Sequence, residues 1–212
     1  MKIAVLGTGT AGRTLALGFQ RLGHEVTVGT RDPAATRARE DWTLDITLQP
    51  YAEVAVDADL VVNVTNGQGS LSALGMVGAQ TLSGKVILDV ANPLDFSAGF
   101  PPTLTVKDTD SLAEQIQRAF PEARVVKALN TVTAAVMVDP SRVGDGGTTM
   151  FLAGDDASAR STVGELLGAF GWRDVVVFEE LSAARAMEMW LPLWVRLMGR
   201  LGTADFNLKI VR

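Results

Sequence analysis

Short apolar runs alternate along the chain with longer segments in which apolar residues recur at helical spacing. The runs are rich in valine, isoleucine and leucine, and they predict strands at Lys2–Leu6, Glu25–Gly29, Leu60–Val64, Lys85–Val90, Val125–Leu129, Thr149–Ala153, Val175–Phe178 and Phe206–Val211. The segments between them predict helices at Ala11–Leu22, Pro33–Glu40, Leu71–Gln80, Ser111–Phe120, Ala157–Phe170 and Ser182–Gly202, with a short turn near Tyr51–Val56. Because most runs are unbroken rather than alternating, the strands are expected to be parallel and covered on both faces. This order predicts a doubly wound α/β fold.

A glycine-rich segment joins the first predicted strand to the first predicted helix and reads Gly7-Thr8-Gly9-Thr10-Ala11-Gly12. Glycine at these three positions permits a tight turn, lets a pyrophosphate approach the backbone, and lets the helix pack closely on the strand. The helix N-terminus adds amide donors and a partial positive charge. With a strand before it, a helix after it and a second strand at the right distance, the segment predicts a Rossmann-type dinucleotide-binding site.

The end of the second predicted strand indicates which dinucleotide is bound. Thr30 stands where an NAD-preferring site places Asp or Glu, so nothing there repels a 2′-phosphate, and Arg31 offers a fork-shaped cation to bind it. NADP(H) is therefore favoured over NAD(H). The alternative is that Arg31 is a solvated loop charge, while Asp32 and Pro33 are the cap and first residue of a helix.

Three later strand ends finish in amide or hydroxyl groups, at Val64-Thr65-Asn66, Val90-Ala91-Asn92-Pro93 and Leu129-Asn130-Thr131. Each alone is typical of a turn or a helix cap. Ligands on an open α/β sheet bind outside the carboxyl ends of the strands, so the three together are expected to line the site of the ribose and the nicotinamide.

Composition excludes several kinds of chemistry. The chain has 212 residues, no cysteine, one histidine and a net charge of −5. It therefore has no disulfide, no thiol nucleophile and no metal site built on cysteines or several histidines. The acidic balance argues against nucleic-acid binding, and no apolar stretch approaches the length of a membrane span, so we expect a cytoplasmic protein. His24 falls in a turn at the opposite edge of the sheet. Lys127 is a site residue, a strand-end lysine whose amine reaches solvent, or part of an ion pair.

The length allows one large domain or one domain with an appendage. We expect an NADP-binding part at residues 1–135 and a small C-terminal α/β extension at 136–212, packed on it, that supplies the acceptor pocket and a dimer contact. In the last predicted helix, Trp190 and Trp194 begin an apolar stripe that must face a core, a partner or a flat ligand. Pro192 is expected to kink that helix.

The chain resembles, over nearly its whole length, the NADP oxidoreductases that depend on the deazaflavin coenzyme F420. The resemblance lies in Gly7–Gly12, Gly23–Val26, Gly29–Arg31, Asp89–Pro93, Val126–Thr131, Gly154–Asp156 and Phe206–Ile210. It implies a compact Rossmann protein, often dimeric, that passes hydride between NADPH and the deazaflavin. Thr8 to Gly12 would hold the pyrophosphate, Thr30 and Arg31 the 2′-phosphate, and Thr65, Asn92 and Ala134 would border the nicotinamide. Some archaeal members differ from this chain, with histidine in place of Asn130 and proline in place of Thr133.

Hydride transfer between NADPH and a flat, flavin-like acceptor needs little acid–base help from the protein, which suits a site without histidine, thiol or metal. Asn130, Thr131 and Thr133 are expected to position the reacting rings. Two alternatives remain open, a reductase of a small imine or carbonyl substrate and a non-catalytic NADP-binding redox sensor. The residues expected to bind the cofactor are Gly7, Thr8, Gly9, Thr10, Ala11, Gly12, Thr30, Arg31, Thr65, Asn66, Ala91, Asn92, Asn130 and Ala134.

Overall fold

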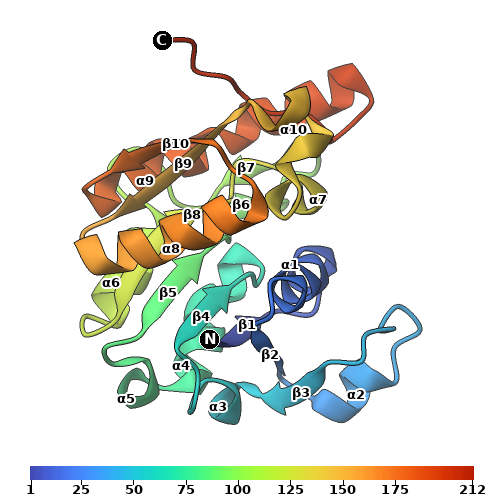
Figure 1. Ribbon diagram of the computed structural model, residues 1–212, viewed down its shortest axis with the longest axis vertical. Coiled ribbons are helices and arrows are strands. Elements are labelled where there is room, and N and C mark those ends of the chain that lie inside the picture. Colours follow the sequence, from blue (N-terminus) through green and yellow to red (C-terminus); the bar gives the residue numbers. More distant parts are fainter.

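The computed structural model describes residues 1–212 and has at its centre one eight-stranded sheet with helices on both faces (Figure 1). The strands lie in the order β10-β9-β8-β5-β4-β1-β2-β3. From β3 to β8 every neighbouring pair is parallel, which is the strand order of the dinucleotide-binding fold. The bounds are β1 (Lys2–Leu6), β2 (Glu25–Thr30), β3 (Thr47–Pro50), β4 (Leu60–Asn63), β5 (Val86–Asp89), β8 (Arg124–Ala128), β9 (Thr149–Gly154) and β10 (Asp174–Phe178).

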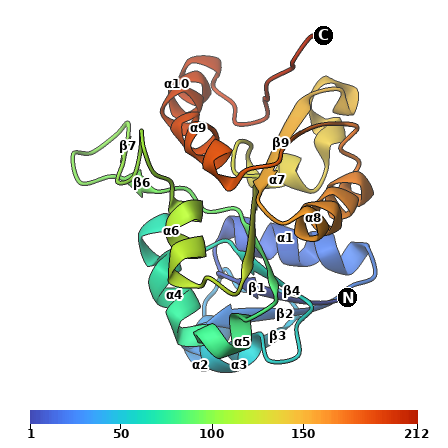
Figure 2. The ribbon, with the colours of Figure 1, turned by 90° about the vertical axis from the view of Figure 1, so that its left-hand side faces the viewer.

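Two helical layers cover the sheet (Figure 2). On one face lie α1 (Thr10–Arg21), α7 (Ala134–Met137) and α8 (Ala157–Phe170), and on the other lie α3 (Tyr51–Val54), α4 (Ser70–Val77), α5 (Ala79–Leu82) and α6 (Leu112–Ala119). Alternate residues of β1 enter the two apolar cores, Ile3 and Val5 on one side and Ala4 and Leu6 on the other. This double burial explains the unbroken apolar runs, and the predicted Rossmann-type, mostly parallel fold is confirmed.

The residues after 135 extend the same sheet rather than forming a sheet of their own. β9 pairs with β8 in the antiparallel direction, and β10, which follows α8, pairs parallel to β9. Because the sheet is continuous across β8 and β9, the boundary near residue 135 stays a prediction.

The predicted strand at Phe206–Val211 is wrong, because this segment is an extended tail without regular secondary structure. The Thr149 N–H donates to Leu208 O (2.9 Å), and the Ile210 N–H donates to the Thr149 hydroxyl (2.9 Å). β8 pairs with β9 only at Leu152–Gly154, so the first residues of β9 are open on that side, but the tail bonds to β9 through Thr149 alone and does not continue as a ladder. The apolar pattern of the tail therefore predicted a strand that does not form.

The predicted helix at Ser182–Gly202 is divided into a 3₁₀ turn (Leu181–Ala183), α9 (Ala184–Met189) and α10 (Leu191–Leu201). The interruption is at Trp190, and Pro192 lies in the first turn of α10, where a missing N–H costs no helical bond. The predicted helix is thus divided two residues before the proline at which a kink was expected.

The helix predicted at Pro33–Glu40 is present but shorter, as α2 (Pro33–Arg37). Two short features give no clear signal in the sequence, the strand β3 and a hairpin of β6 (Leu94–Asp95) and β7 (Thr103–Leu104). Three further 3₁₀ turns lie at Gly67–Gly69, Pro140–Arg142 and Gly144–Gly146. The hairpin projects from the body of the molecule, beyond α6 (Figure 2). None of the helices has the length and hydropathy needed to cross a lipid bilayer.

Candidate functional site

The glycine loop follows β1 and can only be built from glycine at two of its positions. A Cβ on Gly7, whose φ is +134°, would lie 2.7 Å from Val64 O, and a Cβ on Gly12 would lie 2.1 Å from Gly7 O. At Gly9, by contrast, no atom lies within 4 Å of the Cβ position. α1 begins at Thr10 without any side-chain cap, so the amides of its first turn are free to bind an anion beside Gly9.

A cleft runs along the carboxyl ends of the parallel strands and consists of two adjoining hollows. The first is lined by the glycine loop, Arg31, Tyr51 and Gln68, among others. The second is lined by the ends of β4, β5 and β8 and by apolar side chains of the hairpin and α10. Both hollows share Val64, Thr65 and Asn66, which makes the cleft continuous.

Ten of the residues predicted to bind the cofactor line this cleft. They are Gly7, Thr8, Gly9, Ala11, Arg31, Thr65, Asn66, Ala91, Asn92 and Asn130. Arg31 is exposed and lies close enough to the half-buried Tyr51 to oppose the rise that burial causes in the pKa of the tyrosine.

The other predicted residues lie nearby without lining the cleft. Thr30 is buried, and its hydroxyl is bonded to that of Thr36 (2.7 Å). Thr131 is also buried, and its hydroxyl has no partner. Thr133 and Ala134 form the start of α7, directly after β8, while Thr10 and Gly12 belong to α1.

Arg39 is a candidate site residue that sequence reasoning missed. Its guanidinium donates to the Thr8 hydroxyl oxygen (2.8 Å), and a carboxylate, Asp41, holds it from the other side (Nη2 to Oδ2, 2.6 Å). Arg13 of α1 also pairs with Asp41, and the two arginines hold the pKa of this carboxyl far below its usual range. Because Arg39 occupies an acceptor position on Thr8, the hydroxyl proton of Thr8 is left to donate to a ligand. Arg39 lies in an irregular loop, and nothing in its sequence context signals the contact.

Thr65, at the end of β4, belongs to a closed set of hydrogen bonds. Its hydroxyl donates to Asn63 Oδ1 (2.8 Å) and lies 2.9 Å from the Ser70 hydroxyl, which also accepts from Asn63 Nδ2 (3.0 Å). Asn63 Nδ2 donates in addition to Asp89 Oδ1 (2.8 Å). Since the Thr65 proton is used within the protein, this hydroxyl can only accept from a ligand.

Asn130, at the end of β8, is held in one orientation. Its amide nitrogen donates to Met187 O (3.0 Å) and to Asn92 Oδ1 (2.9 Å), while the Asn92 amide donates to Asn130 O (3.0 Å). Backbone carbonyls only accept, so they fix the direction of both amides. The preceding residue, Leu129, is buried with φ +65°, a strained conformation of the kind that collects at functional sites.

Lys127 is completely buried and does not line the cleft, so the ion-pair interpretation is the correct one. Its ammonium group contacts Asp89 Oδ2 (2.7 Å) and Glu188 Oε1 (2.8 Å) and also donates to Ala91 O. Burial lowers the pKa of Lys127, but the two carboxylates outweigh it and the net change is upward. Burial raises the pKa of Glu188, against the effect of Lys127. The triad joins β5 and β8 to α9 immediately beneath the cleft.

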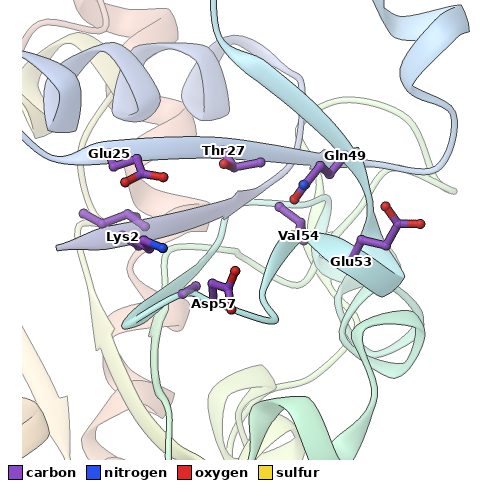
Figure 3. A pocket seen from close by; sticks show the side chains of 9 residues that line it. Lys2, Glu25, Thr27, Gln49, Glu53, Val54 and Asp57 are labelled. Atoms are coloured by element: carbon purple, nitrogen blue, oxygen red, sulfur yellow. The ribbon is translucent and has the colours of Figure 1, made fainter.

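Another hollow begins at the amino ends of β1 and β2, where Lys2 lies between Glu25 and Asp57, and extends to Gln49 and Glu53 (Figure 3). It shares no lining residue with the cleft. His24 is at this same edge, next to the N-terminal amine, as the sequence predicted.

Comparisons with known proteins agree with the geometry of the cleft. The family model described as "NADP oxidoreductase coenzyme F420-dependent" matches residues 2–93. The F420-dependent NADP reductase of Methanocaldococcus jannaschii is 28% identical over 209 residues, which cover 93% of this chain and 92% of the relative. The metalloreductase STEAP3 of Rattus norvegicus is 29% identical over 91% of this chain, and the match covers only 38% of that protein's length.

A solved structure gives a closer match. The protein of Arthrobacter sp. FB24, provisionally named an F420-dependent NADP reductase, is 54% identical over the full length of both chains, with a TM-score of 0.97. The imine reductase of Streptomyces aurantiacus, at 18% identity and a TM-score of 0.63 over 95% of this chain and 64% of that chain, shares the fold.

Proposed function

Because the chain belongs to the coenzyme F420-dependent NADP oxidoreductase family, we propose that it transfers hydride between NADPH and a deazaflavin of the F420 type. The observation that carries the proposal is the continuous cleft, which joins a glycine loop and Arg31 at one end to a hollow walled by Phe96, Leu191 and Trp194 at the other. The first part suits a phosphorylated dinucleotide, and the second suits a flat, largely apolar ring.

The residues of the cleft fit NADP(H). The open space beside Gly9 and the uncapped start of α1 would receive the pyrophosphate. Thr8, whose proton is free to donate, would add a hydrogen bond to a phosphate oxygen, and Arg31 would pair with the 2′-phosphate. Thr30, buried beneath Arg31, would shape that corner through its bond to Thr36 rather than by direct contact.

The protein's own contribution to the reaction is to hold two planar rings face to face. NADPH, when bound, supplies the hydride. Asn92, Asn130 and Thr65 orient the nicotinamide end through hydrogen bonds, and Thr131, Thr133 and Ala134 form the backbone that supports it. None of the residues that line the second hollow is ionisable, which matches a transfer that needs no protein acid.

The test mixes the purified protein with NADPH and oxidised F420 and follows the absorbance of the deazaflavin. Turnover is expected, and it is expected to depend on Arg31. The absence of turnover at saturating NADPH would reject the proposal. Oxidation of NADPH by an imine or carbonyl but not by F420 would favour the small-substrate reductase, and tight NADPH binding without any turnover would favour the redox sensor.

We also propose that the protein is a cytoplasmic homodimer. Large apolar side chains are exposed on α10 and at the tail, including Leu193 (51%), Leu201 (55%) and Val211 (89%), and a second copy would cover them. Light scattering coupled to size exclusion would give the mass of the particle, and a monomer at micromolar concentration would contradict the dimer.

A further inference from the structure

The buried ammonium group of Lys127 uses all three of its N–H donors inside the protein. Two go to carboxylates, Asp89 Oδ2 (2.7 Å) and Glu188 Oε1 (2.8 Å), and the third goes to the backbone oxygen of Ala91. The side chains of Lys127, Asp89 and Glu188 are at most 1% exposed. Ala91, by contrast, lines the second hollow of the cleft. The triad is therefore bonded directly to the wall of the candidate site.

Both polar groups of the Ala91 backbone are held by members of the triad. Its N–H donates to Asp89 Oδ1 (3.3 Å), and its C=O accepts from Lys127. β5 ends at Asp89, and Ala91 has no partner in the sheet ladders on either side. Because no neighbouring strand fixes the backbone at this point, the direction of these peptide groups depends on the two charged side chains.

The carboxylate of Asp89 also reaches a second part of the cleft wall. Its Oδ1 accepts from Asn63 Nδ2 (2.8 Å), and Asn63 Oδ1 in turn accepts from the Thr65 hydroxyl (2.8 Å). Thr65 lines both hollows. Glu188 differs, because its remaining partners are two amides in the first turn of α6, which do not line the cleft. Asp89 thus connects Lys127 to the site, whereas Glu188 connects it to the body of the fold.

We propose that Lys127 and Asp89 are positioning residues for hydride transfer. They fix the backbone of Ala91, and the carboxylate also orients Thr65 through Asn63. This inference rests on the proposed function. Both side chains are fully buried, so they act on the wall against which the ring lies and not on the ring itself. Misplacement of reacting groups by about 1 Å can slow a reaction about a hundredfold. The pair is therefore expected to govern the rate of transfer, while the affinity for NADPH depends mainly on phosphate contacts in the first hollow.

Asp89→Asn and Glu188→Gln form a matched pair of variants. Each puts an amide, with a single acceptor oxygen, where a buried carboxylate accepts from Lys127 and from backbone amides, and the amide cannot satisfy both partners. Only at Asp89 does the backbone partner belong to the cleft wall. The test measures kcat and the KM for NADPH with F420 as acceptor, and hydrogen exchange of the Ala91 amide in ligand-free protein. All measurements are made at a temperature at which circular dichroism shows wild type and variants folded.

Asp89→Asn is expected to lower kcat about tenfold or more while changing the KM for NADPH by less than about threefold. Exchange at Ala91 should be faster in this variant, without any ligand present. Glu188→Gln is expected to keep kcat and the exchange at Ala91 close to wild type, although it also weakens the triad. An effect of Glu188→Gln on kcat as large as that of Asp89→Asn, or an unchanged kcat in Asp89→Asn, would overturn the positioning role and leave the proposed function standing. Wild-type protein without turnover would overturn both.

A double variant, Asp89→Asn with Lys127→Met, covers the case in which the single variant does not fold. Removing one charge of each sign together costs less than leaving a buried charge without its partner. The oxygen of Ala91 still loses its donor, so the double variant is expected to show the same fall in kcat. A kcat equal to that of wild type would overturn the positioning role.

Discussion

Removal of the Glu188 carboxylate is expected to cost the fold much of its stability. Glu188 is 1% exposed and accepts three hydrogen bonds, from Lys127 Nζ (2.8 Å), Leu112 N (2.8 Å) and Ala113 N (3.2 Å). Glu188→Ala leaves the buried ammonium of Lys127 with one carboxylate, Asp89, and leaves two amides of the first turn of α6 unsatisfied.

The magnitude follows from the cost of breaking a buried ion pair by removing one partner, about 3–5 kcal/mol. For a chain of 212 residues this corresponds to a fall in Tm of roughly 6–20 °C. Asp205→Ala is the control, because it breaks an ion pair with Arg142 whose side chains are 35% and 45% exposed, and such pairs contribute about 0–1 kcal/mol.

Urea denaturation measures the effect, with the midpoint shifting at unchanged m-value. Lys127→Met and the double variant complete a cycle with Glu188→Ala. Since the two groups touch, the double variant should cost at least about 1 kcal/mol less than the sum of the single variants. A loss below about 1 kcal/mol for Glu188→Ala, or strict additivity in the cycle, would show that the triad does not stabilise the protein as argued.

Three further outcomes are expected. Arg31→Ala should raise the KM for NADPH about tenfold and leave that for NADH nearly unchanged, since only NADPH carries the 2′-phosphate; equal effects on both would contradict the role of Arg31. Arg39→Ala should raise the KM for both cofactors by about threefold to tenfold without changing kcat, because Thr8 would serve a phosphate that both share; an effect on NADPH alone would assign Arg39 to the 2′-phosphate instead. Hydrogen bonds from Thr149 and Lys209 lower the pKa of Asp174 to about 2. The ionised carboxylate stabilises the docked tail above its usual pKa, and this stability is lost as the pH falls from about 4 to 2. The backbone amides of residues 206–212 should therefore lose protection from hydrogen exchange over that range. Asp174→Asn should lack the protection already at pH 7, and a protected tail in that variant would refute the link.

The sequence predicted those parts of the fold and the site that depend on residues close together in the chain. The glycine loop, the unbroken strands and the polar strand ends follow rules of short range, and the structure places Thr65, Asn92 and Asn130 at one edge of one sheet, as expected. The role of Lys127 was ambiguous, because its partner Glu188 lies far away along the chain.

Other features depend on contacts that no local pattern records. Arg39 reaches Thr8 across an irregular loop, and Thr30 is buried with its hydroxyl bonded to that of Thr36 in α2. The apolar tail at 206–211 has the composition of a strand, but its backbone meets β9 only at Thr149, and one such contact does not make a ladder. A segment of high strand propensity forms a strand only when a neighbouring strand pairs with it along its length.

The link between Glu188 and α6 also bears on the order in which the protein can fold during its synthesis. The backbone amide of Leu112 donates to the carboxylate of Glu188, which is translated 76 residues later, and Lys127 also precedes Glu188. Domains generally fold as units as they emerge from the ribosome. Here, a nascent chain that already contains the six parallel strands from β3 to β8 still lacks Glu188, one of the two carboxylates that pair with the buried Lys127. The last helices therefore act as the closing step of folding, and ribosome-bound chains that end before α9 are expected to remain more sensitive to protease than chains that include it.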